Sequence, residues 1–315
     1  MNDAAITFFR SRGYTGTYND AFRKYLIDLT GDTTGTIDDL LSKILSMYSG
    51  SIADKILSYG RDKNYLGTFN DVIIQIWLGG GFQWTPAAFG SNLVLWLDAT
   101  DASTITLNGS NVSQWNDKSG NARHVSQSTA VNQPQYEATG LNGRPTFNWG
   151  SAINNKGLRN DAVSNFNPTR YFIVAEYDGS DPFNEYAGLV AHNFIANPDV
   201  VMTQNTGTGW FAGTSFFHNG ATSATTTALP TISQPFVAAS NFAQSANRTN
   251  LFVGNDRFLP GLTRGWRGKI SEVIAIDYVP SVAERNRAEG YLAWKWGLEA
   301  NLPAGHPFKN TPPTL

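Results

Sequence analysis

The sequence predicts a protein of mixed α and β structure: a small N-terminal helical module, then an all-β sandwich or jelly roll that ends in a helix. Three observations support this fold class. One capping phrase recurs four times before residue 72. Many short β-rich segments follow, with no helical pattern between them. Two apolar stretches, 93–98 and 270–277, suit neighbouring buried strands from opposite ends of the β region.

The composition excludes several classes of partner. Only 15% of the 315 residues are charged and the net charge is −2, so no electrostatic footprint for nucleic acid or an anionic membrane exists. No apolar run approaches the roughly 18 residues of a membrane span, and the first ten residues lack the apolar segment of a signal peptide. Without cysteine there are no disulfides and no thiolate metal sites. We expect a soluble protein made in a reducing cytoplasm.

Residues 1–78 form the predicted helical module. Thr or Ser precedes Asp by three residues in each phrase, which is a variant of the capping box; the four phrases are 16–20, 35–39, 50–54 and 67–71. Helices shorter than about 12 residues do not persist alone in water, so these must pack on one another or on a partner. The apolar residues that would dock the module onto a larger assembly are Phe22, Leu26, Leu41, Ile44, Ile74 and Trp77. A self-contained bundle is the alternative.

Residues 79–91 form a Gly-rich joint, and the β domain spans 92–315. Within this domain, Asn108-Gly109 lies between two alternating segments and predicts a hairpin. Residues 117–121 are rich in side chains that bond to local backbone, which predicts a turn. Further strands are expected at 145–149, 171–175, 188–191, 210–212, 236–239 and 249–253.

A terminal helix follows the β segments. Ser281 and Glu284 form a full capping box after a proline. The helix should run to Trp296 and stop at Gly297, which suits the residue after a helix end. The face expected to pack on the sandwich comprises Ala288, Tyr291, Leu292 and Lys295. Four prolines beyond it predict an extended tail.

Four motifs carry a resemblance to a known family: LVLWLDATD at 93–101, VSQWNDKSG at 112–120, QPQY at 133–136 and LNGRP at 141–145. Together they resemble the laminin-G-like, concanavalin A-like jelly roll of bacterial surface proteins and of bacteriophage tail-fibre and other virion proteins. Residues 283–298 resemble the closing segment of the same phage proteins. The resemblance covers about 91–315 and implies the jelly-roll fold.

For function, the resemblance implies a non-enzymatic bacteriophage virion structural protein. It would be a compact tail or capsid appendage that displays a lectin-like domain, made in the bacterial host cytoplasm and located in the virion. The N-terminal helices would contact other virion proteins, and a homotrimer is expected by analogy with phage fibres. The alternatives are an attachment protein that binds host glycans and a glycan depolymerase.

Carbohydrate binding is the activity that individual residues favour most. It requires an exposed aromatic platform with nearby amide donors, which Trp210, His218 and Asn219 would supply in a Gly/Thr/Asn-rich segment. The alternative is that the aromatic rings of this segment fill the core.

No catalytic constellation is expected. Glu176 and Asp178 would share a strand face, as paired carboxylates of a glycosidase require, but the following Gly179-Ser180 predicts a solvent-exposed turn instead. No cofactor is expected either. Because laminin-G-like domains often hold a calcium ion at one rim, the resemblance offers Asp98, Asp101 and Asp117 as candidate ligands. Asp in turns otherwise bonds to the backbone.

Overall fold

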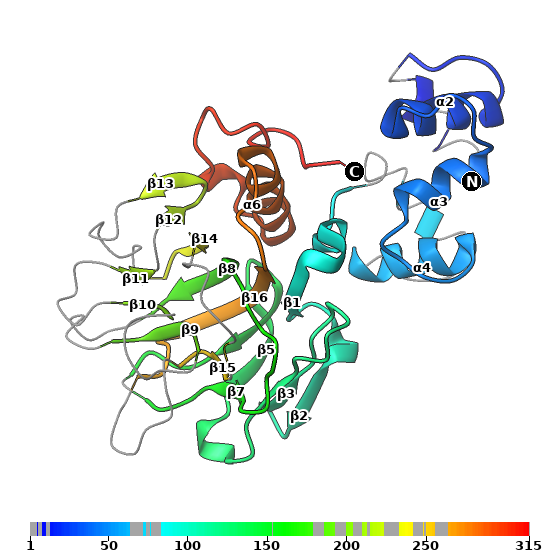
Figure 1. Cartoon of the computed structure of the whole chain (residues 1–315). Helices are drawn as coiled ribbons and strands as arrows, with labels where there is room; N and C mark the ends of the chain where they lie inside the picture. Colours follow the sequence, from blue (N-terminus) through cyan, green and yellow to red (C-terminus); the bar gives the residue numbers. More distant parts are fainter. Residues whose placement is uncertain are drawn as a thin grey trace. The chain divides into compact units, whose positions relative to one another are not determined.

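In a computed structural model of the chain, residues 1–90 with 312–315 form one compact unit, and residues 91–311 form a second (Figure 1). The structure describes residues 5, 8–10, 13–63, 72, 73, 76, 83–152, 154–178, 186–192, 200–203, 210–212, 215–223, 233–241, 248, 250–255 and 264–314. Among them, no helix combines the length and the apolarity that crossing a bilayer requires. The division into docking module, joint and sandwich stays a prediction.

The first unit contains the helices α2 (Tyr18–Thr30), α3 (Ile37–Ile44) and α4 (Ile52–Asp62). Each begins with a reciprocal capping box, in which a Thr or Ser hydroxyl accepts from the backbone of an Asp whose carboxylate accepts in return. The capping phrases at 16–20, 35–39 and 50–54 therefore do start helices, as predicted. The fourth phrase lies outside the described residues. Apolar and aromatic side chains of the three helices share one core.

The second unit is built from antiparallel strands and one long helix. The strands are β1 (Leu93–Asp98), β2 (Ile105–Asn108), β3 (Asn111–Trp115), β4 (Val125–Ser126), β5 (Gln135–Leu141), β6 (Arg144–Asn148), β7 (Leu158–Asn160), β8 (Arg170–Tyr177), β9 (Gly188–His192), β10 (Val200–Thr203), β11 (Trp210–Ala212), β12 (Ser215–His218), β13 (Ala221–Ser223), β14 (Pro235–Asn241), β15 (Leu251–Val253) and β16 (Gly268–Ile276). The helix is α6 (Val282–Trp296), and the short 3-10 helices of this unit are η2 (Ala102–Thr104), η3 (Ala130–Asn132) and η4 (Glu299–Asn301). A further 3-10 helix, η1 (Pro86–Asn92), includes residues of both units.

The strands join into one antiparallel sheet, in the order β11-β10-β9-β15-β7-β4-β3-β5-β6-β16-β8-β14-β12-β13, with β1 added on β16 and β2 on β3. The sheet curls back on itself, because Tyr171 of β8 reaches His192 of β9, two strands that are not neighbours in this order. The two side chains meet at 2.6 Å between the tyrosine hydroxyl and Nε2. Both residues are fully buried, so their contact lies in the core of the unit. An α and β protein with a large antiparallel sheet is what the sequence predicts.

The predicted partnership of 93–98 with 270–277 is confirmed by the pairing of β1 with β16. In this register, Trp96 is opposite Ile274 and Asp98 is opposite Glu272. In an antiparallel pair, directly opposed residues project from the same face. This register therefore brings two carboxylates side by side on one face of the sheet, and both are fully buried.

Helix α6 covers that face. It begins with the predicted capping box of Ser281 and Glu284 and ends at Gly297, whose φ of 69° is the left-handed conformation that glycine adopts readily. The predicted face is confirmed, since Ala288, Tyr291 and Leu292 are buried. After α6 the chain runs back along the helix, where the Trp294 indole N–H donates to the carbonyl of Phe308 at 2.8 Å.

Candidate functional site

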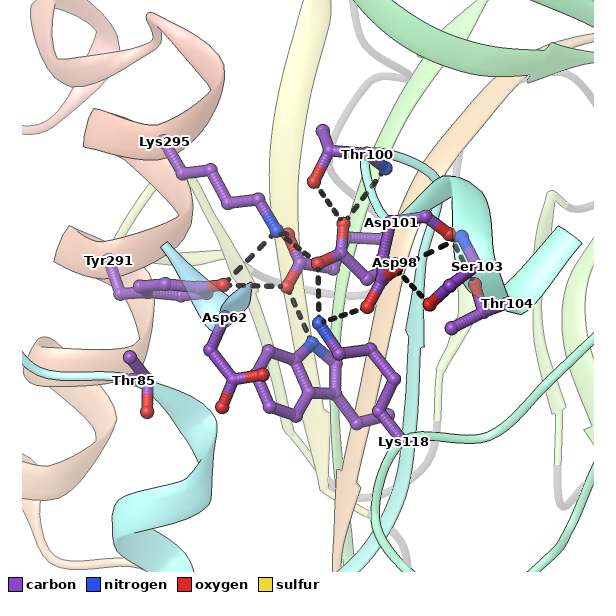
Figure 2. A network of polar contacts seen from close by, with 12 residues as sticks. Asp62, Thr85, Asp98, Thr100, Asp101, Ser103, Thr104, Lys118, Tyr291 and Lys295 are labelled. Atoms are coloured by element: carbon purple, nitrogen blue, oxygen red, sulfur yellow. Dashed lines mark hydrogen bonds and ion pairs between the residues drawn. The ribbon is translucent and has the colours of Figure 1, made fainter. Parts of the chain in front are cut away.

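A group of buried charged side chains lies between α6 and the sheet (Figure 2). The sheet contributes Asp98 and Glu272, the helix contributes Lys295, and the turn after β3 contributes Lys118. The Lys295 ammonium lies 2.8 Å from Asp98 Oδ2 and 2.9 Å from Glu272 Oε2. The Lys118 ammonium lies 3.2 Å from Asp98 Oδ2 and 3.0 Å from Asp101 Oδ2. Two cations thus bridge three carboxylates.

Glu272 accepts from four donors and has no exposed surface. The indole N–H of Trp96 and the hydroxyl of Tyr291 donate to Oε1, at 2.8 and 3.1 Å. The indole N–H of Trp296 donates to Oε2 at 2.7 Å, beside the Lys295 ammonium. Because all four partners present hydrogens, the geometry suits the ionised carboxylate.

The pKa values of the two central carboxyl groups move in opposite directions. Burial acts to raise the pKa of Asp98, but the adjacent Lys295 and Lys118 charges outweigh it and hold this pKa well below its ordinary value. Burial and the neighbouring Asp98 charge raise the pKa of Glu272, and Lys295 and the Trp296 indole only partly oppose this effect. The difference follows from the partners, because Asp98 contacts two ammonium groups and Glu272 contacts one.

This cluster has paired carboxylates but no access for a substrate. The Lys295 ammonium contacts an oxygen of both Asp98 and Glu272, so the two carboxyl groups are close neighbours. Both are fully buried beneath α6, however, and neither lines a cavity that the structure describes. The cluster therefore fixes the helix on the sheet. A buried ion pair adds little net stability, because the cost of desolvating both charges offsets much of their attraction.

The candidate calcium site is occupied by protein groups. Lys118 lies between Asp98 and Asp101, where a cation would have to bind. The third candidate ligand, Asp117, accepts from the backbone N–H groups of Trp96, Ser119 and Arg123. No group of acidic or His side chains in the described part of the chain has the arrangement of a metal site.

The residues predicted to bind carbohydrate lie in and beside two strands. Trp210 is in β11, and its side chain lies outside the described residues. His218 ends β12 and lies against the Phe236 ring, with centroids 5.3 Å apart; burial lowers its pKa. Asn219 follows in the turn to β13, where its side-chain oxygen accepts from the backbone N–H of Val237 at 2.8 Å. The described contacts of His218 and Asn219 thus stabilise the β12–β13 turn.

The residues predicted for docking are placed as follows. Phe22, Leu26, Leu41 and Ile44 are buried in the core of the helical unit itself. Ile74 and Trp77 lie outside the described residues. The four described side chains pack on their own unit, and docking stays a prediction.

The expectation of a solvent-exposed turn at Glu176 is wrong, because β8 continues to Tyr177. Glu176 is buried and pairs with Lys269 at 3.0 Å. Asp178 accepts from the hydroxyl of Ser233 at 2.9 Å. Each carboxylate therefore has a partner of its own, which leaves no catalytic pair here.

A polar cleft that the sequence does not reveal lies where β4 pairs with β7. Its volume is about 460 Å³, within the roughly 300–1,000 Å³ of small-molecule sites. The lining residues are His124, Ser126, Gln127, Ser128, Arg159, Asn160, Asp161 and Ala162. Seven of these eight side chains are polar, so the cleft suits a ligand that is polar over most of its surface.

Hydrogen bonds fix several of these side chains before any ligand binds. The Asn160 amide donates to the carbonyl of His124 at 2.7 Å and accepts from the backbone N–H of Ala162 at 3.0 Å. The Gln127 amide donates to the carbonyl of Gly157 at 3.0 Å. The walls of the cleft are therefore pre-organised, which lowers the entropy cost of binding.

The charged pair of the cleft is at its mouth. Arg159 Nε lies 3.1 Å from Asp161 Oδ2, and the two side chains are 45% and 51% exposed. The amide of Asn250 donates to the other carboxylate oxygen of Asp161 at 3.2 Å. An ion pair with this exposure contributes at most about 1 kcal/mol to stability, so rearranging this pair around a ligand costs little.

Comparisons with known proteins show no family. No family model and no curated protein sequence matches the chain. Solved structures of Trypanosoma rangeli sialidase resemble it weakly. A mutant displaying trans-sialidase activity gives a TM-score of 0.35 at 11% identity, over 73% of this chain and 37% of that one. The complex with 2,3-difluorosialic acid gives 0.39 at 10% identity, over 76% and 39%. This chain thus spans less than two fifths of those sialidase chains.

These findings correct two predictions. The chain is not shown to be a non-enzymatic bacteriophage virion structural protein: the structures named above are sialidases, which are enzymes, and neither is a virion protein. The prediction that the chain is not an enzyme is overturned by the same finding. In the motifs at 93–101 and 112–120, Trp96, Asp98 and Asp117 make internal contacts that indicate no function. TM-scores below 0.4 do not assign sialidase activity to this chain.

Proposed function

We propose that the second unit is a concanavalin A-like jelly roll that binds a glycan in the cleft between β4 and β7. The antiparallel pairing throughout the sheet, with β1 adjacent to the distant β16, supports this fold. The buried contact between Tyr171 and His192 supports a sheet folded over a common core. The cleft is the observation on which the function depends.

The chemistry of the cleft matches a hydroxyl-rich ligand. Sugar hydroxyls both donate and accept, and the cleft offers carboxylate acceptors, guanidinium donors and serine hydroxyls within one volume. The His124 ring adds a donor. Its Nδ1 accepts from the backbone N–H of Asp117 at 2.9 Å, so the proton of the neutral ring is on Nε2. An apolar ligand would displace water from these groups without offering hydrogen bonds in return, and each buried donor or acceptor that loses its partner in this way costs about 1–3 kcal/mol.

A glycan array probed with the full chain tests the proposal, followed by calorimetric titration of the oligosaccharide that binds best. Replacing Arg159 with Gln keeps most of the side-chain length but removes the charged donors. We expect the Kd to rise about tenfold or more, since hydrogen bonds to charged groups contribute about 1.5–3 kcal/mol.

Two further variants complete the test. Arg287→Gln changes an exposed arginine of α6 outside the cleft and should leave the Kd unchanged. Trp210→Ala tests the residue singled out from the sequence. Binding that is lost in Trp210→Ala but kept in Arg159→Gln would place the glycan elsewhere and refute the cleft. Absence of any binding on the array would refute the proposed function itself.

The helical unit remains a candidate for contacts with other proteins, and the trimer remains a prediction. Light scattering of the purified chain measures its oligomeric state directly.

A further inference from the structure

We infer that Asp161 makes the cleft selective for neutral sugars over sugars that carry a carboxylate. The inference rests on the proposed function and adds the class of glycan. Its basis is the balance of charge in the cleft, together with the fixed position of the Asp161 carboxylate.

The charges lining the cleft cancel. Among the described residues that line the cleft, Arg159 is the one cationic side chain and Asp161 is the one anionic side chain. They form an ion pair at 3.1 Å. The ring of His124 in its neutral form presents Nε2–H as an uncharged donor, because Nδ1 accepts from the Asp117 backbone. The described lining of the cleft therefore carries no net positive charge that would attract an anionic ligand.

The Asp161 carboxylate is also held in place. One oxygen is paired with Arg159 and the other accepts from the Asn250 amide at 3.2 Å. A carboxylate bound by both oxygens does not turn away easily from an incoming like charge. A sugar carboxylate that approached Arg159 would have to displace Asp161 or remain beside it, and both arrangements are unfavourable.

A neutral sugar meets no such conflict. Two adjacent hydroxyls can donate to the Asp161 carboxylate and accept from the Arg159 guanidinium without breaking the ion pair. The hydroxyl groups of Ser126 and Ser128 line the same cleft and can contact neighbouring hydroxyls of the sugar. The cleft therefore favours a sugar with adjacent free hydroxyls and no charge.

The test compares ligands that differ in one group. Methyl glycosides of glucose, galactose and mannose are titrated against the full chain by ligand-observed NMR, each beside the uronic acid in which the C6 hydroxymethyl is a carboxylate. We expect at least one neutral sugar to bind tenfold or more tightly than its uronic acid. The difference should persist at high salt, because the local repulsion acts at contact distance.

The variant Asp161→Asn removes the repelling charge and keeps the size of the side chain. It should raise the affinity for the uronic acid at least tenfold and narrow the preference for the neutral sugar. Equal or tighter binding of uronic acids to the natural chain would overturn the inference and leave the proposed function intact. An unchanged preference in a folded Asp161→Asn would overturn it as well. Failure of every sugar to bind would instead count against the proposed function.

Discussion

Lys295 shows how a single side chain positions a helix. Its ammonium contacts Asp98 of β1 and Glu272 of β16 at once, and its aliphatic stem shares the packed face of α6. Neither carboxylate is exposed, so neither can be solvated if the lysine is removed. The residue therefore compensates two buried charges as well as contributing contacts.

Replacing Lys295 with Met should destabilise the second unit by about 3–5 kcal/mol, because Glu272 loses its ammonium partner and Asp98 loses one of two. Urea unfolding at pH 7 measures the effect. Lys156→Met is the matched control, since this half-buried lysine lies in the same unit and forms no ion pair with the described residues. Similar unfolding midpoints for the two variants would contradict the role of Lys295.

The effect of Lys295→Met should depend on pH. In the natural chain the lysines hold the pKa of Asp98 below its unfolded value of about 3.9, so its contribution is present above that value and lost as pH falls below it. Burial raises the pKa of Glu272, so the contribution of this group to stability falls as pH rises. Without Lys295, burial also raises the pKa of Asp98. Protonation at low pH then removes the cost of burying the two negative charges. The stability difference between variant and natural chain should therefore shrink between pH 7 and pH 4; an equal difference at both would contradict this account.

At the scale of the element, α6 and the segment after it depend on Gly290. Glycine inside a helix normally costs about 1 kcal/mol relative to alanine. Here a Cβ would lie 2.7 Å from Cβ of Phe308, which the Trp294 indole holds by its carbonyl. Gly290 is thus needed for the close approach of Phe308 to the helix. Replacing a helical glycine with alanine usually stabilises a protein, but here the replacement should destabilise it.

Gly290→Ala should displace residues 306–309 from the helix. Lys309, which donates to the carbonyl of Leu302 at 2.7 Å, would become accessible, so trypsin should cleave after it several times faster than in the natural chain. Val282→Ala, at an exposed position of the same helix, serves as control. A cleavage rate unchanged in Gly290→Ala, with a rise in stability, would show that the contact is unimportant.

The elements that could be predicted from sequence are those with local determinants. Ser281 and Glu284 define the start of α6 because their hydrogen bonds close within one turn. β1 and β16 are predicted by their apolar runs. β5 and β7 have no such pattern: β5 carries mostly exposed or half-buried residues, and β7 is three residues long. These two become strands because their neighbours supply pairing partners, and such partners are far away in sequence.

The cleft was missed for the same reason. His124 and Arg159 are 35 positions apart in the chain, and the pairing of Ser126 with Arg159 brings their strands together. His, Asn, Asp and Ser are also common in turns, so their composition gave no indication of a site. The predicted carbohydrate site, Trp210 with His218 and Asn219, lies within one short stretch of sequence. The lining of the cleft instead comes from two segments that are distant in sequence.

At the scale of the whole molecule, the two units differ in what they offer a ligand. The buried apolar side chains of the described helices pack in the core of their own unit. The second unit combines a helix fixed by buried charges with an open polar cleft on strands away from that helix. Stability and ligand binding can therefore be changed independently, since Lys295 and Arg159 share no contact partner among the described residues.

The most direct test of this account is a crystal structure of the chain soaked with the neutral oligosaccharide that binds best. We predict sugar density in the cleft, with hydroxyls within hydrogen-bond distance of Asp161 and Arg159 and the β4–β7 backbone unmoved. Well-defined sugar density at another surface, with the cleft empty, would contradict the central claim.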